Sequence, residues 1–180
     1  MLKFFDKVRA EFGKLSQEQV DGFNVLLQAT DGLPVSWRAY CLATAWHETN
    51  KTMQPVIEAY WLSEDWRKRN LRYYPWYGRG YVQLTWKENY KLMDNELGLG
   101  GQLLKDPSLA QKPDIAAKIL VVGMTRGFFN GRRKGLGVYI NCNVGTRAEF
   151  REARRTVNIL DKADQIAGYA LTFQEALLDG

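Results

Sequence analysis

Cysteine is scarce in this 180-residue sequence, which contains only Cys41 and Cys142. Two cysteines cannot form the cross-links of a disulfide-rich secreted domain, and neither has a second Cys or a His at metal-ligand spacing. Histidine is scarcer still, since His47 is the only one. Zinc amidases and peptidases generally need two or more histidine ligands, so the sequence predicts no metal and no cofactor. We expect two buried free thiols.

Long hydrophobic runs are also absent. No stretch approaches the roughly 20 apolar residues that a membrane span needs. Near the N-terminus, Asp6 and Glu11 interrupt the apolar residues too early for the apolar core of a signal peptide. Internal repeats, low-complexity segments and linker-like changes of composition are missing as well. We therefore expect a protein made in the cytoplasm, without stable membrane insertion, that forms one domain over 1–180.

The balance of charge is basic, with a formal net charge of +5 and a pI near 9.2. This balance favours an anionic partner, which could be a nucleic acid, an acidic membrane surface or a bacterial envelope. Charge alone does not choose among them. The basic residues lie in scattered clusters, and no nucleic-acid-binding motif is recognisable. A basic nucleic-acid-binding module is therefore a distant alternative, and we expect no nucleic-acid partner.

Helix signals dominate the sequence. Ser16 and Gln19 have capping-box spacing and predict a helix near 17–30. Apolar residues at helical spacing predict a second helix through CLATAWHE, which places Glu48 at its C-terminal end. The other predicted helices cover about 86–97, start at Pro113, run from Thr146 toward Val157 and start at Asp161. The prediction is a mainly α fold with at most a short β-hairpin around 81–84.

Helical periodicity fails between 50 and 81, where prolines and glycines accompany many aromatic residues. We interpret about 50–84 as a structured loop region that forms a small lobe over a helical body. Ten of the 23 aromatic residues lie within 60–90. Sugar rings present flat C–H faces that pack on aromatic planes, so this concentration favours a binding cleft. The alternative is that several of these rings pack the lobe itself.

Glu48 and Glu58 are suited to the hydrolysis of a glycosidic bond. That reaction needs a protonated acid for the leaving oxygen, and usually a second carboxylate that activates water. Glu48 follows an apolar helix face beside Trp46, where desolvation favours the protonated form. Glu58 lies in the aromatic loop. Either residue could instead be an ordinary surface carboxylate, so the pair alone is weak support.

The segment YGRGYVQLTWKENY, at 77–90, is the most informative. Gly78 and Gly80 allow close approach of the backbone to a neighbour or ligand. Thr85 could offer its hydroxyl to a water or a sugar, or could simply cap the next helix through the spacing it has to Glu88. The side-chain amides of Gln83 and Asn89 suit sugar hydroxyls and N-acetyl groups.

Four blocks of the sequence resemble a known family. In order, they are WHET at 46–49, GRGYVQLTWKENY at 78–90, ARRTVN at 153–158 and DKADQIAGYALTFQEAL at 161–177. They resemble the chitinase-like glycoside hydrolase family 19, in the form carried by many phage endolysins, over about 40 to 177. The resemblance implies a lysozyme-like helical fold with a cleft between two lobes. It also implies inverting, single-displacement hydrolysis.

The resemblance assigns three catalytic roles. Glu48 becomes the general acid, and Thr85 becomes a helper that holds the attacking water, because it occupies the position where plant members have Ser. Glu58 is matched as the second carboxylate through the shorter endolysin-type spacing. Plant chitinases instead separate their two glutamates by a longer, disulfide-bearing segment, which makes this assignment less direct than the other two.

The same alignment assigns the substrate contacts. Gln83, Asn89 and Asn158 are expected to bind substrate, and Tyr77 and Arg79 are expected to line the cleft. Plant members usually follow the last asparagine with Gly-Gly, where this chain has Ile-Leu. The sugar contact at Asn158 is therefore expected to differ from theirs.

Two hydrolase functions lead. The first is an endolysin, an N-acetylmuramidase that cuts the β-1,4 bond between N-acetylmuramic acid and N-acetylglucosamine in the peptidoglycan glycan strand. It is expected to be monomeric, to lack a separate cell-wall-binding domain, and to reach the wall from the host cytoplasm only after release. The alternative is a chitinase acting on β-1,4 N-acetylglucosamine polymers. The missing disulfides and secretion signal argue against a secreted plant-type chitinase.

Overall fold

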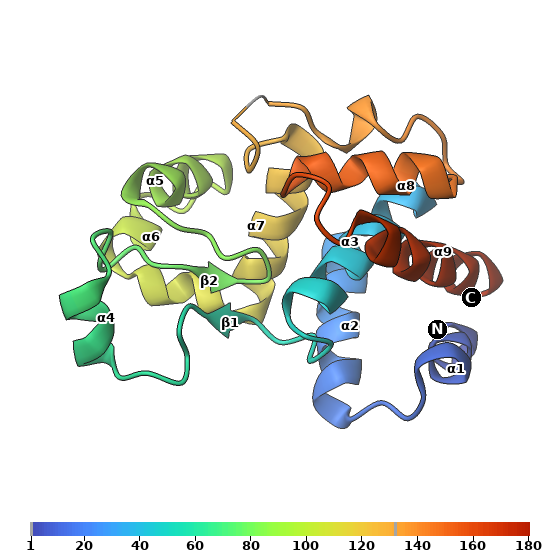
Figure 1. The fold of residues 1–180 in the computed structure, drawn as a ribbon, viewed down its shortest axis with the longest axis horizontal. Helices are drawn as coiled ribbons and strands as arrows, with labels where there is room; N and C mark the ends of the chain where they lie inside the picture. Colours follow the sequence, from blue (N-terminus) through green and yellow to red (C-terminus); the bar gives the residue numbers. More distant parts are fainter. Residues whose placement is uncertain (1, 132) are drawn as a thin grey trace.

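The computed structural model describes residues 2–131 and 133–180. Its helices are α1 (Leu2–Phe12), α2 (Gln17–Ala29), α3 (Val35–Glu48), α4 (Glu64–Asn70), α5 (Lys87–Glu96), α6 (Gln102–Lys105), α7 (Pro113–Arg126), α8 (Arg147–Ala153) and α9 (Ala163–Asp179). Short 3-10 turns cover Pro107–Gln111, Leu136–Val138 and Arg154–Thr156. The strands β1 (Val56–Ile57) and β2 (Arg79–Gly80) pair antiparallel (Figure 1). The predicted mainly α fold is confirmed.

Two predicted capping boxes set the starts of their helices. At α2, the Ser16 hydroxyl accepts the Gln19 N–H, and the Gln19 side chain accepts the Ser16 N–H. Thr146 and Glu149 make the same reciprocal pair at α8. α8 ends at Ala153, short of the predicted limit near Val157, because the chain continues as a 3-10 turn. Each box satisfies N–H groups that the first helical turn leaves free.

The prediction that Thr85 and Glu88 form a capping box at α5 is wrong. The residue before α5 is Trp86, which has a positive φ of 75° and no side-chain cap. Thr85 is thereby displaced from the capping position, and its hydroxyl donates to the Gln83 carbonyl at 2.8 Å. The Asn89 amide donates back to the Thr85 carbonyl at 2.8 Å. Thr85 therefore stabilises the turn before the helix instead of the helix end.

α3 runs through the middle of the helical body. Its side chains from Ala39 to Trp46 are all buried, and α9 packs along it. Around Trp46 lie the rings of Phe23 and Phe173, with centroids 5.6 and 6.1 Å away. α1 lies outside the predicted helices and adds Phe4 to this core, 5.8 Å from Phe23. Rings at these separations bury large apolar areas, so the body is stabilised mainly by hydrophobic packing.

The small lobe has a second, smaller core. It consists of Leu84, Tyr90, Met93, Leu103, Ala110 and Ile119. The lobe core thus uses residues of 84–119, beyond the predicted segment of about 50–84. α7 separates the two cores, because Ile119 faces the lobe while Ala117 and Leu120 pack in the body (Figure 1). This helix fixes how the lobe sits against the body.

Two local expectations need correction. Cys41 is buried, but Cys142 is exposed in the loop before α8, where its thiol lies 2.9 Å from the Val144 carbonyl. The predicted hairpin around 81–84 exists as one bridge between Arg79 and Leu84, and the regular pairing of β2 is with β1. Within the described residues, no helix has the length and apolar character needed to cross a membrane.

Candidate active site

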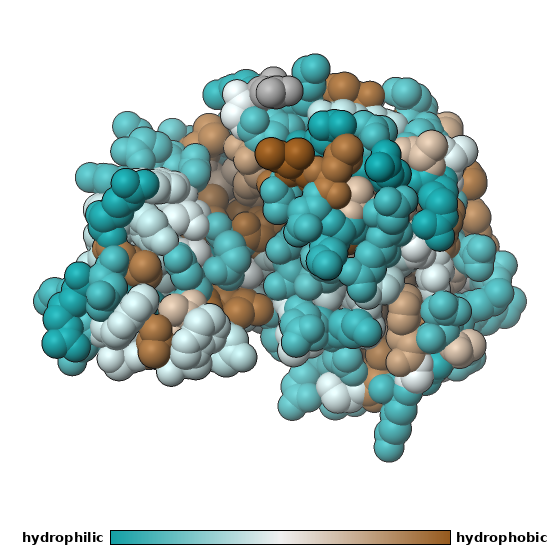
Figure 2. Space-filling view, viewed as in Figure 1, coloured by the Kyte–Doolittle hydropathy of each residue, from teal (hydrophilic) through white to brown (hydrophobic). Residues whose placement is uncertain are grey.

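An open cavity of about 990 Å³ lies between the helical body and the small lobe. Figure 2 shows the surface notched between these two parts. Glu48 lines the cavity from the end of α3, while Ile57 and Tyr60 line it from the lobe. Ligand pockets commonly measure roughly 300–1,000 Å³, so the space is large enough for an extended ligand.

The chain leaves α3 through a turn of unusual backbone conformation. Asn50, Lys51 and Met53 have positive φ values of 48°, 69° and 56°. Such left-handed residues other than glycine are uncommon and gather at functional sites. The turn directs the chain from Glu48 along the cavity wall toward β1.

A buried arginine holds the Glu48 side chain. Arg154 Nη1 lies 2.7 Å from Glu48 Oε1, and the two side chains are 2% and 24% exposed. Arg154 Nε also donates to the Asp161 carbonyl at 3.0 Å. A guanidinium this deeply buried requires a counter-charge, which Glu48 supplies. The ion pair thus fixes a carboxylate at the cavity wall while leaving part of it open to solvent.

Sequence reasoning missed Arg154. It lies in the ARRTVN block, where nothing in the spacing separates it from Arg155. The structure does separate them, because Arg155 makes a half-exposed pair with Glu152 at 2.8 Å. Of these two arginines, Arg154 is the one whose side chain contacts α3, at Glu48.

His47 lies next to Glu48 and is half-buried. Burial lowers the pKa of His47 below its usual value, and the attraction of the Glu48 carboxylate opposes this change only in part. The imidazole is therefore mostly neutral near pH 7. The imidazole therefore adds little positive charge beside the Glu48 carboxylate. Arg154 is the main cationic partner of this carboxylate.

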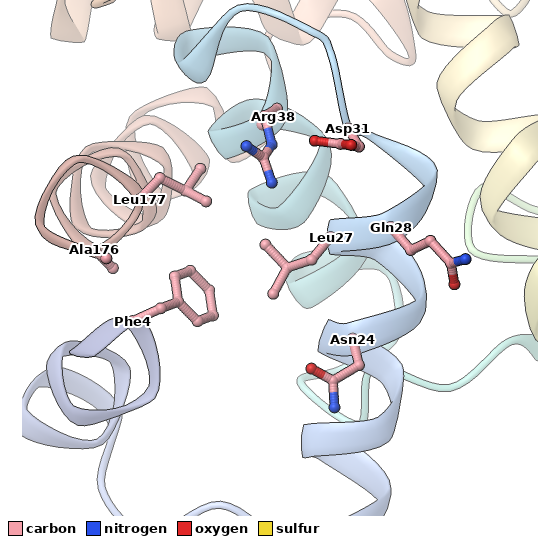
Figure 3. A pocket seen from close by; sticks show the side chains of 9 residues that line it. Phe4, Asn24, Leu27, Gln28, Asp31, Arg38, Ala176 and Leu177 are labelled. Atoms are coloured by element: carbon pink, nitrogen blue, oxygen red, sulfur yellow. The ribbon is translucent and has the colours of Figure 1, made fainter. Parts of the chain in front are cut away.

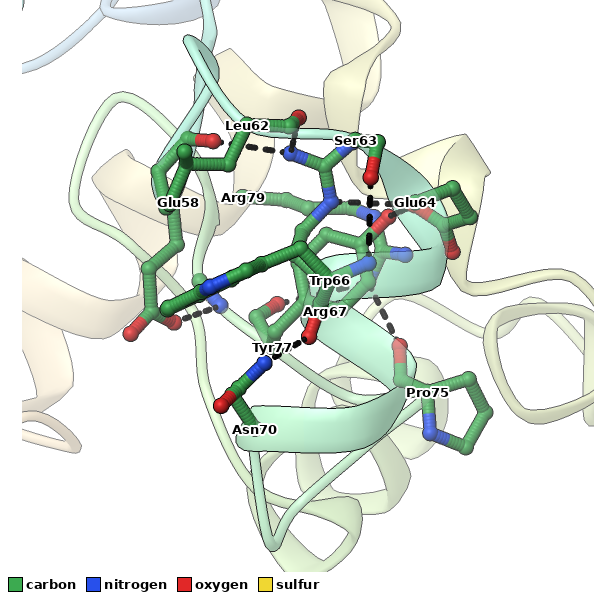
Figure 4. Close-up of polar contacts among 12 residues, drawn as sticks. Glu58, Leu62, Ser63, Glu64, Trp66, Arg67, Asn70, Pro75, Tyr77 and Arg79 are labelled. Carbon is green, nitrogen blue, oxygen red and sulfur yellow. Dashed lines mark hydrogen bonds and ion pairs between the residues drawn. The ribbon is translucent and has the colours of Figure 1, made fainter.

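Neutral hydrogen-bond donors hold the Glu58 side chain. The Tyr73 hydroxyl donates to Oε1 at 2.6 Å, and the Gly78 N–H donates to Oε2 at 2.8 Å. The hydrogen bond to Glu58 raises the pKa of Tyr73 to about 12, so the phenol stays protonated. Figure 4 shows the Glu58 side chain with a dashed line from its carboxylate to a backbone nitrogen. Its neighbour Ile57 lines the cavity, whereas Glu58 is not among the lining residues. Sequence reasoning did not identify Tyr73 as the partner.

A side chain at Gly78 would crowd the polar groups around Glu58. A Cβ at this position would lie 2.5 Å from Gln83 Oε1 and 3.2 Å from Glu58 Oε2. Gln83 in turn donates from Nε2 to the Val56 carbonyl at 2.9 Å. Gln83, Thr85 and Asn89 therefore form one chain of hydrogen bonds linked to β1, and its Gln83 end lies beside Gly78 and Glu58.

Tyr77 and Arg79 are buried under this segment. Arg79 Nη1 donates to the Pro75 carbonyl and to the Tyr90 hydroxyl, both at 2.9 Å. The guanidinium carbon lies 3.6 Å from the centre of the Tyr77 ring, and the Tyr77 hydroxyl donates to Glu64 at 2.8 Å. Both were expected to line the cleft. The structure buries both of them inside the lobe instead (Figure 4).

Asn158 lies on the helical body, apart from the other predicted polar groups. It lines a separate cavity of about 390 Å³ together with Phe129, Tyr139 and Ile159. Its backbone N–H donates to the Arg154 carbonyl at 2.9 Å, which connects it to the partner of Glu48. Its side-chain oxygen accepts the Ile159 N–H at 2.8 Å.

A further cavity of about 640 Å³ opens between α1, α2, α3 and α9. Phe4, Leu27 and Leu177 give it an apolar floor, with Arg38 and Asp31 on one side (Figure 3). None of the predicted site residues lines it. Among the residues that the structure describes, no three His, Cys, Asp or Glu side chains are grouped so that they could hold a metal ion.

Comparisons with known proteins bear on the fold. No protein-family model matches the sequence, and no curated protein matches it. Chitinase C from Streptomyces griseus HUT6037 is similar in structure, with a TM-score of 0.50 and 21% identity over 93% of this chain and 75% of that one. A mutant of chitinase C is similar as well, with a TM-score of 0.51 and 20% identity over 93% of this chain and 91% of that one. The predicted lysozyme-like helical fold is thereby confirmed.

Proposed function

We propose that this protein is a glycoside hydrolase that cuts the β-1,4 bond between N-acetylmuramic acid and N-acetylglucosamine in peptidoglycan. The observation that carries this proposal is the position of Glu48. It lies at the wall of a cavity between two lobes and is held by the buried Arg154. Glu58 follows β1, whose Ile57 lines the same cavity. Glu58 itself does not line the cavity, so the proposal takes its carboxylate from the adjoining loop as the second group that an inverting hydrolase requires.

In the proposed reaction, the protonated form of Glu48 gives its proton to the glycosidic oxygen as the bond from that oxygen to the anomeric carbon breaks. The ion pair with Arg154 that the structure holds is the state after this transfer. Arg154 then faces the carboxylate that remains and stabilises it. A water attacks the opposite face of the sugar, and Glu58 takes its proton. Inverting hydrolysis needs the two carboxyl groups roughly 6.5–9.5 Å apart, so that the water fits between them.

The polar residues near the carboxylates have supporting roles in this proposal. Thr85 holds the attacking water with its hydroxyl, while Gln83 and Asn89 bind sugar hydroxyl or N-acetyl groups from the lobe. Asn158 lines a separate cavity on the body, so in this proposal it contacts the glycan only where the strand extends beyond the cavity of Glu48. Tyr77 and Arg79 act indirectly, since their buried contacts stabilise the loop of Glu58. The reaction needs no cofactor.

The resemblance of the sequence to phage endolysins supports peptidoglycan as the substrate. On this proposal the protein acts as a monomer, is made in the host cytoplasm, and meets the cell wall from the periplasm after release. A chitinase is the second candidate, favoured by the structural similarity to chitinase C. The two differ in one product, because only peptidoglycan cleavage yields reducing ends of N-acetylmuramic acid.

The test is incubation of the protein with purified peptidoglycan and, separately, with colloidal chitin, with and without EDTA. We expect new reducing ends of N-acetylmuramic acid by mass spectrometry, unaffected by EDTA. Glu48→Gln should lower turnover by roughly 10²–10⁴-fold, as expected for the loss of a general acid. Glu18→Gln is the matched control, because Glu18 lines the same cavity. It should keep its activity.

Three results would count against the proposal. Cleavage of peptide stems alone would indicate a peptidase or amidase, and activity on chitin alone would favour the second candidate. Near-normal turnover by Glu48→Gln would mean that another group is the acid. Because this substitution leaves Arg154 without its counter-charge, circular dichroism should accompany each assay to verify folding.

A further inference from the structure

Two aromatic rings are exposed in the turn at 59–62, the tip of the small lobe. Tyr60 and Trp61 are 69% and 71% exposed, and their ring centroids lie 5.2 Å apart at an interplanar angle of 85°. Neither ring belongs to the two hydrophobic cores. Adjacent large rings left in solvent gain nothing from folding, so their exposure indicates a binding role.

A buried arginine holds this tip in place. Arg67 Nη1 donates to the carbonyls of Ala59 and Leu62, both at 2.9 Å, which lie on either side of the two rings. Its Nε pairs with Glu64 at 3.0 Å (Figure 4). The guanidinium carbon also lies 5.3 Å from the centre of the Tyr77 ring. Arg67 thus holds the turn that carries Tyr60 and Trp61 in place through these four contacts.

The backbone of the tip is equally constrained. Ala59 has a positive φ of 51°, a conformation that residues with a Cβ adopt rarely. The Leu62 N–H donates to the Ala59 carbonyl at 2.9 Å, which closes the turn. A rigid turn reduces the conformational entropy that is lost when a ligand binds to its rings. The exposure of the two rings is therefore fixed by the fold.

The tip is continuous with the candidate active site, because Tyr60 lines the same cavity as Glu48. We propose that Tyr60 and Trp61 form a stacking subsite for pyranose rings of the amino-sugar polymer, at the lobe side of the cavity. The proposal rests on the proposed function. Flat C–H faces of sugars pack on aromatic planes. Rings at nearly right angles offer faces in two directions, which suits the uneven surface of a glycan strand.

The subsite should act on binding and leave the chemical step alone. A contact to a remote part of the substrate, made equally in the ground and transition states, lowers KM without changing kcat. This lowering of KM should also require a glycan strand that is long enough to reach Tyr60 and Trp61. The protein is thereby expected to prefer long glycan strands over short oligosaccharides.

The test compares Trp61→Ala and Tyr60→Ala with the wild type on long glycan strands and on short soluble oligosaccharides of the same polymer. Each substitution should raise KM on the long strands roughly tenfold, while kcat stays within about twofold. On the short substrates both constants should stay near wild type. Trp61→Phe keeps an aromatic face and should restore most of the affinity. Leu178→Ala, at a residue 51% exposed on α9, is the control.

A binding assay separates this proposal from the proposed function. Glu48→Gln, with and without Trp61→Ala, is sedimented with insoluble peptidoglycan or chitin. Loss of co-sedimentation on adding Trp61→Ala supports the subsite even if the wild type proves inactive. Unchanged KM and unchanged co-sedimentation would overturn it. So would binding to phosphatidylglycerol vesicles that depends on Trp61 while polymer binding does not, since the tip would then contact membranes.

Discussion

The helical body and the small lobe hold their glutamates by different means. In the body, Glu48 ends an apolar helix and pairs with a buried cation. In the lobe, Glu58 follows a two-residue strand and accepts hydrogen bonds from a neutral phenol and a backbone N–H. The Glu48 carboxylate is thus fixed by an ion pair, and the Glu58 carboxylate by hydrogen bonds within the lobe. The same residue type can therefore take two roles because its surroundings differ.

The two parts also differ in what stabilises them. The body buries a large continuous core of aliphatic and aromatic side chains. The lobe core is small, and buried charged groups make up for its size, namely Arg67, Arg79 and Asp94. Apolar packing tolerates small shifts, whereas a buried polar group left without its partner is costly. Disruption of the apolar core of the body should therefore need loss of volume, whereas the lobe should be disrupted by the change of one polar atom.

The largest expected effect on stability is in the body core. Phe23→Ala should lower the free energy of unfolding by about 3–5 kcal/mol, because it leaves a cavity among Phe4, Trp46 and Phe173. Urea unfolding followed by circular dichroism measures the change. Leu178→Ala, on the exposed face of α9, should stay within about 0.5 kcal/mol. Equal effects of the two would contradict the view that ring packing stabilises the body.

Arg154→Met should have the next largest effect. It leaves the Glu48 carboxylate without its partner, and stability should fall by about 1–3 kcal/mol, since Glu48 stays partly in water. Activity should also fall, because the carboxylate left by proton transfer is no longer stabilised. Adding Glu48→Gln should restore much of the stability but none of the activity. If the stability losses of the two single variants simply add up in the double variant, the two residues do not interact.

Asp94→Asn probes the lobe with a change of one atom. The Asp94 carboxylate accepts the N–H groups of Gly101 at 2.5 Å and Leu103 at 2.8 Å, and Asn would turn an NH₂ group toward one of them. We expect a loss of about 1–3 kcal/mol. Hydrogen exchange should rise around 98–106 before it rises in α3. Exchange that increases uniformly along the chain would mean that lobe and body unfold together.

The smallest expected effect is at the α8 capping box, in acid. The Thr146 backbone N–H holds the pKa of Glu149 below its usual value of 4.5. The unfolded chain therefore binds the proton more readily, so this stabilisation is complete above pH 4.5 and is lost as pH falls below it. Glu149→Gln should remove a few tenths to about 1 kcal/mol of stability at pH 7 and less at pH 3. A loss of equal size at both values would show that the charge contributes nothing.

Local sequence signals predicted most of the longer helices but missed α1, α6 and α4, the last of which lies in the segment interpreted as a loop region. They predicted the site only in outline. Ser16 and Thr146 cap their helices as predicted, because a capping box needs only four consecutive residues. Thr85 has the same spacing to Glu88 and fails, because the positive φ of Trp86 moves the start of α5. That conformation depends on the Trp86 N–H donating to the Trp76 carbonyl at 2.8 Å, a contact between residues ten apart.

Sequence by itself determined the mainly helical class, the location of Glu48 at a helix end and the aromatic character of 60–90. These features follow from periodicity and composition, which act over a few residues. Only the tertiary structure decided that Arg154 faces Glu48, that Tyr73 binds Glu58 and that Arg79 is buried. Glu48 and Arg154 lie 106 positions apart. Their contact joins the end of α3 to the 3-10 turn that starts at Arg154, and no local pattern records it.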